Sequence, residues 1–200
     1  MRRFFLVIAM GLTSFALASA ARAAEELPRG FATVEPFGYA VYPLPSKGAE
    51  AGFFLAPDAA ISFSFAKGNA TQLLTKYDAS LLLVRYKLLV GSLSHGNFGI
   101  GARRFAETLD VPTTTGVFNA SAHRTSVIAE ASFGSRFNVG PALVACDWLG
   151  VALPLATLSQ GDNYPDNVDA SERDQDRADF AKVTTKPSLE LLRLSVGVQF

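Results

Sequence analysis

The stretch LELLRLSVGVQF, residues 189–200, decides the fold, because its side chains separate into two unlike sets. Counted back from the end, every second residue is large and apolar: Phe200, Val198, Val196, Leu194 and Leu192. The residues between them are small or polar: Gln199, Gly197, Ser195 and Arg193. Alternate side chains of an extended chain point to opposite faces. The segment is therefore predicted to be a β-strand with one apolar face.

Several earlier segments repeat this period of two. In HRTSVIAEASFGSRFN, residues 123–138, Glu130 and Arg136 share one face, and Phe133 and Phe137 share the other. The same alternation runs through AAISFSFAKG (59–68), LLLVRYKLL (81–89) and NFGIGARRF (97–105). Residues 141–156 are apolar on both faces, which fits a long strand with a bulge near Gly150. With two less regular segments before residue 59, the pattern predicts an all-β, up-and-down antiparallel barrel of eight strands.

The expected connections differ in length between the two ends of this barrel. The short ones are residues 56–58, 90–96 and 138–140, and those at the other end are 46–50, 67–76, 109–122 and 157–187. The last of these contains SERDQDRADFAKV, where a short helix is possible with Ser171 as its N-cap. Short turns at one end and long loops at the other are typical of bacterial outer-membrane barrels.

The opening MRRFFLVIAMGLTSFALASAARA is typical of a secretory signal peptide. Arg2 and Arg3 precede an apolar run, residues 4–18, and small residues suited to cleavage follow it. The expected organisation is a signal peptide over residues 1–23, an N-terminal periplasmic segment over 24–35, and the barrel over 36–200.

Composition narrows the possible partners. The whole chain has 18 Lys and Arg against 18 Asp and Glu, so removal of Arg2, Arg3 and Arg22 leaves a slightly acidic protein, for which no nucleic-acid partner is expected. Its single cysteine, Cys146, cannot form an internal disulfide. No second apolar stretch is long enough for a spanning helix, so a membrane could be crossed only by strands.

The two faces must then be assigned to inside and outside. A soluble periplasmic ligand-binding barrel, which stays an alternative, would turn the apolar face inward. The other face is sparse, with Gly, Ser and isolated Arg, and this suits the narrow lumen of a small membrane barrel. The apolar face carries aromatic residues near the short-turn end, as an interfacial girdle does: Tyr86, Phe98, Phe133, Phe137 and Phe200.

The signal peptide, the strand pattern and the terminal Phe200 resemble the small eight-stranded outer-membrane β-barrels of Gram-negative bacteria, of the OmpX, OmpW and OmpA transmembrane-domain type. The resemblance is one of architecture and covers nearly the whole mature chain. It implies a monomer in the bacterial outer membrane, surrounded by its lipid. It also implies that the barrel-assembly machinery reads the terminal strand, here at Phe200, Val198, Val196 and Leu194.

Charged residues on the inward face are the candidate site. Arg103, Glu130, Asp147 and Arg193 stand at similar distances from the short-turn end of their strands, and Arg85 adds a further base. Charges in a narrow lumen are costly unless paired, so these five are predicted to form an ionic layer. A filled lumen favours a structural or surface-interaction role. Because the inward face is basic overall, a narrow anion-permeable pore is the alternative.

A third alternative is an outer-membrane lipid-modifying enzyme, a hydrolase or acyltransferase. Such an enzyme needs a nucleophile and a base within hydrogen-bonding distance. His123 points outward by parity whereas Ser126 points inward, so no catalytic residues are assigned. The acids of residues 161–176 do not follow the spacing of a calcium-binding loop. Neither a metal nor a cofactor is predicted.

Overall fold

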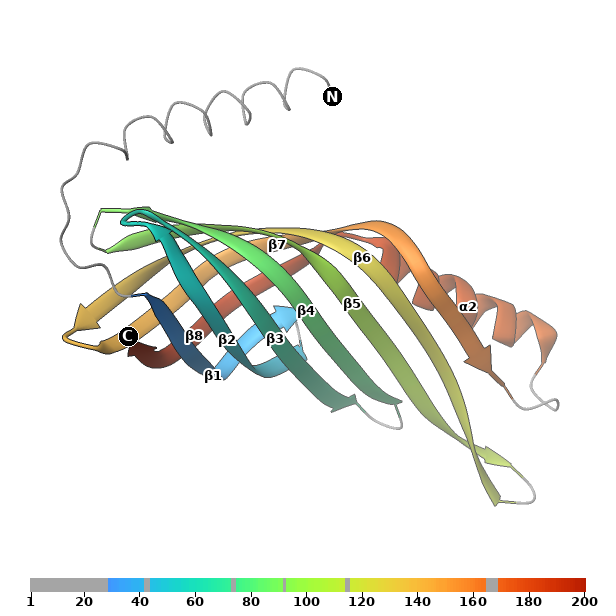
Figure 1. Ribbon diagram of the computed structural model, residues 1–200. Coiled ribbons are helices and arrows are strands. Elements are labelled where there is room, and N and C mark those ends of the chain that lie inside the picture. The colour runs from blue at the N-terminus through green and yellow to red at the C-terminus, as the bar shows by residue number, and fades with distance from the viewer. Residues whose placement is uncertain (1–28, 42–43, 73–74, 92, 114–115, 165–168) are drawn as a thin grey trace, which may run out of the picture.

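The computed structural model describes residues 29–41, 44–72, 75–91, 93–113, 116–164 and 169–200. Its eight strands form a closed barrel in which neighbours in sequence are antiparallel neighbours in space, and the first strand also pairs with the last (Figure 1). This confirms the predicted all-β, up-and-down barrel of eight strands. The strands are β1 (Gly30–Val41), β2 (Leu44–Ala56), β3 (Ala59–Gln72), β4 (Thr75–Val90), β5 (Ser94–Thr113), β6 (Gly116–Val139), β7 (Ala142–Asn163) and β8 (Ser188–Gln199).

The start of the barrel differs from the expected boundary at residue 36. β1 begins at Gly30, so residues 30–35 belong to the barrel wall and not to a periplasmic segment. Within them Glu35 is buried in the lumen, while Val34 is 56% exposed on the outside. The predicted signal peptide, residues 1–23, and residues 24–28 lie outside the described residues.

The short-turn end agrees with the prediction, and two of its turns depend on glycine. Gly91 and Gly140 follow β4 and β6 with φ of 64° and 59°. A side chain is disfavoured in this left-handed region, whereas glycine enters it freely.

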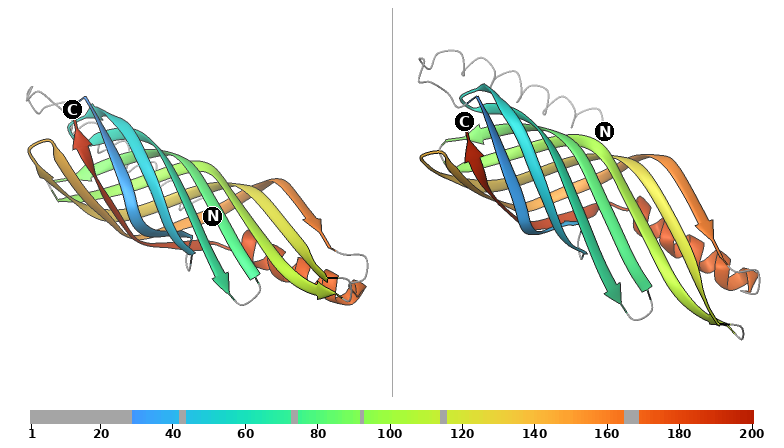
Figure 2. Two further views of the ribbon diagram at one scale, coloured as in Figure 1. Left: turned by 90° about the horizontal axis from the view of Figure 1, so that it is seen from below. Right: turned by 60° about the horizontal axis from the view of Figure 1, so that its bottom comes forward.

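The other end of the barrel corrects the prediction of long loops. β5 continues to Thr113 and β6 begins at Gly116, so most of the expected loop 109–122 is a strand hairpin. The expected loops 46–50 and 67–76 likewise lie almost wholly within β2, β3 and β4. Figure 2 shows β5 and β6 extending beyond the ends of β1 to β3. In the sequence of these segments large apolar residues do not recur at every second position, so the alternation by which a strand is recognised is missing, but the backbone hydrogen bonds are not.

The predicted helix is present as α2 (Ala170–Thr185), between β7 and β8. Its N-cap is Asp169 and not Ser171, because the Asp169 carboxylate accepts hydrogen bonds from Ser171 N at 2.8 Å and Ser171 Oγ at 2.7 Å. These bonds favour the ionised carboxylate and lower the pKa of Asp169. No helix in the described part of the chain is both long and apolar enough to span a membrane.

Large apolar side chains cover the outside of the barrel, and charged ones are buried inside it. Phe63, Leu82 and Ile100 are more than half exposed, whereas Arg85, Glu130 and Arg193 are almost completely buried. The apolar surface ends, toward the helix end of the barrel, at a row of polar residues that pair with one another across neighbouring strands. This polar row is Lys47, Lys67, Ser80, Arg104, Thr125 and Ser159.

The strand register is regular on one side of the barrel and interrupted on the other. The pairs β3/β4, β4/β5 and β5/β6 have no register shift. β7 shifts three times against β6, where Trp148, Leu155 and Leu158 are passed over in the pairing. These bulges explain why residues 141–156 look apolar on both faces, and the first lies near the predicted position, Gly150.

Candidate functional site

Five buried charged residues meet in the middle of the lumen and form what we call the central cluster: Glu35, Arg85, Glu130, Glu190 and Arg193. Arg85 on β4 donates from Nε and Nη2 to the two carboxylate oxygens of Glu130 on β6, both at 2.8 Å. Arg193 on β8 donates from Nε and Nη2 to Glu35 Oε2 on β1, at 2.9 and 2.7 Å. Such two-bond arginine pairs are strong and directional.

Glu190 joins the two pairs. Its Oε2 lies 3.3 Å from Arg193 Nη1 and 3.8 Å from Arg85 Nη2. All five members of the central cluster are at most 4% exposed, so their side chains fill the lumen at this level. Sequence reasoning identified Arg85, Glu130 and Arg193 but missed both Glu35 and Glu190.

Bulges bring the two missed acids inside. In a regular strand Glu190 and Arg193 would point to opposite faces. Leu192 between them has a φ of 47°, and both charged residues are buried while Leu192 is 48% exposed. The available signal was a charge at an outward parity among large apolar residues, where it is expected only if the alternation shifts.

Two glycines make room for the paired side chains. A Cβ at Gly38 on β1 would lie 2.5 Å from Glu35 Oε1 and 2.9 Å from Arg193 Cγ. A Cβ at Gly99 on β5 would lie 2.8 Å from Glu130 Oε2. The backbone approaches the ion pairs so closely that no larger residue fits without displacing them.

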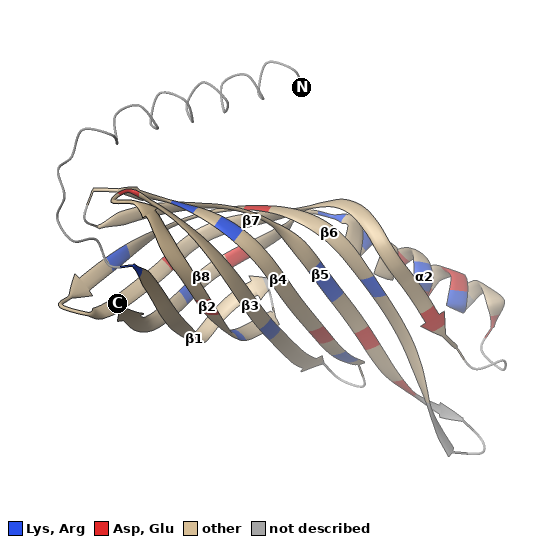
Figure 3. Ribbon diagram, viewed as in Figure 1, with Lys and Arg blue, Asp and Glu red and all other residues tan. Residues whose placement is uncertain are grey.

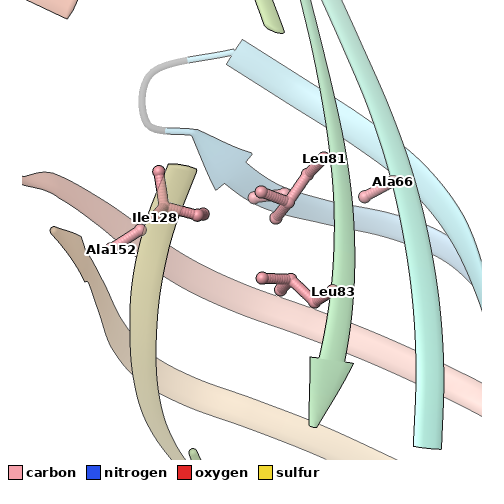
Figure 4. Packing of buried hydrophobic residues seen from close by; sticks show 6 residues of the cluster. Ala66, Leu81, Leu83, Ile128 and Ala152 are labelled. Atoms are coloured by element: carbon pink, nitrogen blue, oxygen red, sulfur yellow. The ribbon is translucent and has the colours of Figure 1, made fainter. Parts of the chain in front are cut away.

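The central cluster is bordered on its outer side by an apolar layer. Figure 4 shows Leu81 and Leu83 of β4 and Ile128 of β6 pointing into the lumen, with Ala66 and Ala152 beside them. Ile128 follows the inward parity of Glu130 and is fully buried. A dry layer next to the ion pairs keeps water away from one side of them.

Asp147, predicted within the ionic layer, lies toward the short-turn end and has different partners. Its Oδ1 is 2.6 Å from His95 Nε2 and accepts a hydrogen bond from Asn97 Nδ2 at 3.1 Å. Sequence reasoning placed His95 in a turn, but it points inward from the start of β5 and is 2% exposed. At the same end, Lys87 pairs with Glu50 at 2.8 Å.

Arg103, also predicted within the ionic layer, instead binds the C-terminal end of α2 and the start of β8. Its Nη1 donates to Ser188 Oγ at 2.6 Å and its Nη2 to the carbonyl of Thr184 at 3.0 Å. Arg124 donates to Thr184 Oγ1 at 3.2 Å. An arginine at a helix C-terminus satisfies carbonyls that have no partner within the helix. The apolar layer separates Arg103 from the central cluster.

The predicted assembly residues lie on the outer face of the closing strand pair. Phe200 and Gly30 exchange backbone hydrogen bonds of 2.9 and 2.8 Å, and the Phe200 side chain is 68% exposed. Leu194, Val196 and Val198 are also exposed, as their parity predicts.

Nothing in the described residues assembles a catalytic pair around His123, which faces away from the buried Ser126. The same part of the chain holds no group of three or more side chains placed to bind a metal ion. No protein-family model and no curated protein matches the chain. The inference of function therefore depends on geometry.

Proposed function

We propose that this protein is a monomeric outer-membrane β-barrel with a closed lumen and a role in structure or surface interaction. The observation that supports it best is the placement of the two faces: paired charges inside and large apolar side chains outside. A water-soluble barrel has the reverse arrangement, and an exposed apolar surface this extensive needs a lipid or protein covering.

The dimensions of the apolar surface support the same proposal. On β4 the apolar surface extends from the polar row at Ser80 toward the short-turn end of the barrel, over residues 81–90. A strand crosses a bilayer in about 9–11 residues. Beyond Ser80 the outward positions are Asp78 and Lys76, which suit water. The long β5–β6 hairpin and α2 then stand outside the membrane.

The central cluster favours a closed lumen over the alternative of an anion-permeable pore. An ion that crosses the lumen would have to separate the Arg85–Glu130 and Arg193–Glu35 pairs and pass the apolar layer around Leu83. We expect no steady conductance in planar bilayers. A stable channel that Glu130→Gln alters would replace this role with that of a pore.

The membrane assignment is tested by fractionating cells and comparing boiled with unboiled protein on a gel. A compact, faster-migrating form in the outer-membrane fraction is expected, because closed barrels resist detergent until heated. A soluble periplasmic protein without a mobility change would refute the proposal.

Phe200→Ser should reduce the amount of folded protein in the outer membrane several-fold, since the terminal aromatic residue belongs to the proposed assembly signal. Phe137→Ser is the matched control, because Phe137 is an exposed aromatic residue at the same end of the barrel. Equal folded levels for Phe200→Ser and the unaltered protein would contradict a terminal signal. Equal losses in the two variants would show only a general need for aromatic residues.

A further inference from the structure

A cavity of about 280 Å³ lies at the outer mouth, between α2 and the inward faces of β4, β5 and β6. On β5 the cavity is lined by Phe105, Glu107 and Leu109, which follow Arg103 toward the hairpin with β6. It therefore lies beyond the polar row, outside the level of the apolar surface. We call it the outer cup. Its volume is just below the range of about 300–1,000 Å³ of most small-molecule sites, so it suits a small ligand.

Aromatic rings form much of the outer cup. Phe105 of β5 packs between Tyr77 of β4, at a ring-centroid distance of 6.2 Å, and Phe180 of α2, at 5.9 Å. Tyr164, which follows β7, adds a fourth ring to the lining. Rings from three different elements thus converge on one hollow, so the cup depends on docking of α2.

Three carboxylates also line the outer cup: Glu107 from β5, and Asp176 and Asp179 from α2. Among the described residues none of the three has a hydrogen-bond or ion-pair partner. Figure 3 shows acidic residues on α2 and on the outer parts of the long strands. Every acid of the central cluster, in contrast, faces an arginine.

The carboxylates act on one another and on the rings nearby. Partial burial and the negative charge of Asp176 both raise the pKa of Glu107. Burial, followed by the charges of Asp176 and Glu107, raises the pKa of Tyr164 as well. Arg177, which pairs with Asp162, stands over the Tyr164 ring at 5.6 Å and offsets part of this effect. The three carboxylates themselves have no ion-pair partner among the described residues, and a partly buried surplus of negative charge favours a cation.

The cation that fits is not a bare metal ion. The carboxylates do not converge closely enough to form a metal-binding group within the described residues. A larger cation can approach separate carboxylates at once, and ring faces attract alkylammonium groups in particular. We propose that the outer cup binds a small organic ammonium ion, with its alkyl groups against Phe105 and Phe180 and its charge near Glu107, Asp176 and Asp179.

The ammonium site gives a ligand class to the proposed surface-interaction role. It rests on the proposed function in one respect only, namely that the ligand enters the outer cup from outside the cell. Binding to the folded protein in detergent does not depend on cellular location. Failure of the ammonium site and failure of the membrane assignment are therefore separately measurable.

The test is calorimetric titration of the purified full-length barrel with choline, and with 3,3-dimethylbutan-1-ol as its uncharged analogue of the same shape. Choline should bind at least tenfold more tightly than the alcohol. Absence of choline binding, or equal binding of the two compounds, would overturn the proposal.

Glu107→Gln should weaken choline binding about five- to tenfold, because it removes one carboxylate from the cup. Asp110→Asn is the matched control, since it removes an exposed outward-facing charge from the same strand. Phe180→Ala should weaken binding by a similar factor through loss of a ring face. Boiled and unboiled migration confirms that each variant is folded, and equal weakening by Asp110→Asn would show only a diffuse charge effect.

Discussion

The wall formed by β3 to β6 and the wall formed by β7, β8 and β1 enclose the same lumen in different ways. In the first, every strand pair keeps one register, and inward residues follow the period of two. In the second, β7 and β1 shift in register and β8 contains the left-handed Leu192. The regular wall contributes Arg85 and Glu130 to the central cluster, and the bulged wall contributes Glu35, Glu190 and Arg193.

The difference shows what a bulge contributes to a narrow barrel. A regular strand presents alternate residues to the lumen. The bulge at Leu192 makes Glu190 and Arg193, three positions apart, face inward together with two outward residues between them. Acid and base from one strand then meet at 3.3 Å. The cost is a residue in a backbone region disfavoured for side chains.

The largest loss of stability should come from removing Arg85, which the regular wall contributes to the central cluster. Arg85→Met leaves Glu130 without its two-bond partner and Glu190 with one arginine, and should destabilise the barrel by about 3–5 kcal/mol. Urea unfolding in detergent micelles, followed by Trp148 fluorescence, measures the change. Arg104→Met, on the outer face of β5, should stay within about 0.5 kcal/mol. Similar losses in the two variants would contradict a special role for the buried pair.

An intermediate effect is expected at the bulged wall. The central cluster has three acids and two arginines, so Glu190→Gln removes the surplus charge while keeping the shape of the side chain. It should change stability by about 1 kcal/mol or less in the same unfolding experiment. A loss as large as that of Arg85→Met would show that Glu190, and not the Arg85–Glu130 pair, holds the cluster together.

The smallest effect concerns the bulge itself. Leu192→Gly should stabilise the barrel by up to about 1 kcal/mol, because glycine adopts a φ of 47° without steric cost. Loss of the exposed leucine's contact with detergent offsets part of this gain. Leu192→Val should be destabilising, since a β-branched residue fits the left-handed region poorly. The reverse order of stability for the two variants would show that the bulge is not strained.

Alternation was enough to predict the eight strands, their connection order and the inward direction of Arg85, Glu130 and Arg193. It failed for Glu35 and Glu190, because a bulge shifts the parity on which the inference depends. Pro36 lies at the register shift of β1, and residues 30–35 before it were therefore not recognised as part of the first strand. No local pattern shows that Arg103 binds the end of α2, since its partners Thr184 and Ser188 are remote in sequence.

Counting residues from the strand ends also could not predict which inward side chains contact one another. Arg103, Asp147 and the central cluster stand at similar counts from the strand ends, but the apolar layer separates Arg103 from the cluster. Asp147 pairs in register with Arg193, yet its hydrogen-bond partners are His95 and Asn97. His95 was assigned to the expected turn 90–96, whereas β5 begins at Ser94 and the partner of His95, Asp147, lies two strands away on β7. The outer cup needs both α2 and the lengthened hairpin, and neither arrangement can be read from one segment.

The reciprocal hydrogen bonds between Gly30 and Phe200 belong to the strand pair that closes the barrel. β1 has one of its two partners as soon as β2 forms, but its other edge stays open until β8 arrives. During that interval the unpaired edge can join any passing strand. The pairing of β1 with β8 therefore removes the last open edge of this sheet, at which another strand could otherwise add.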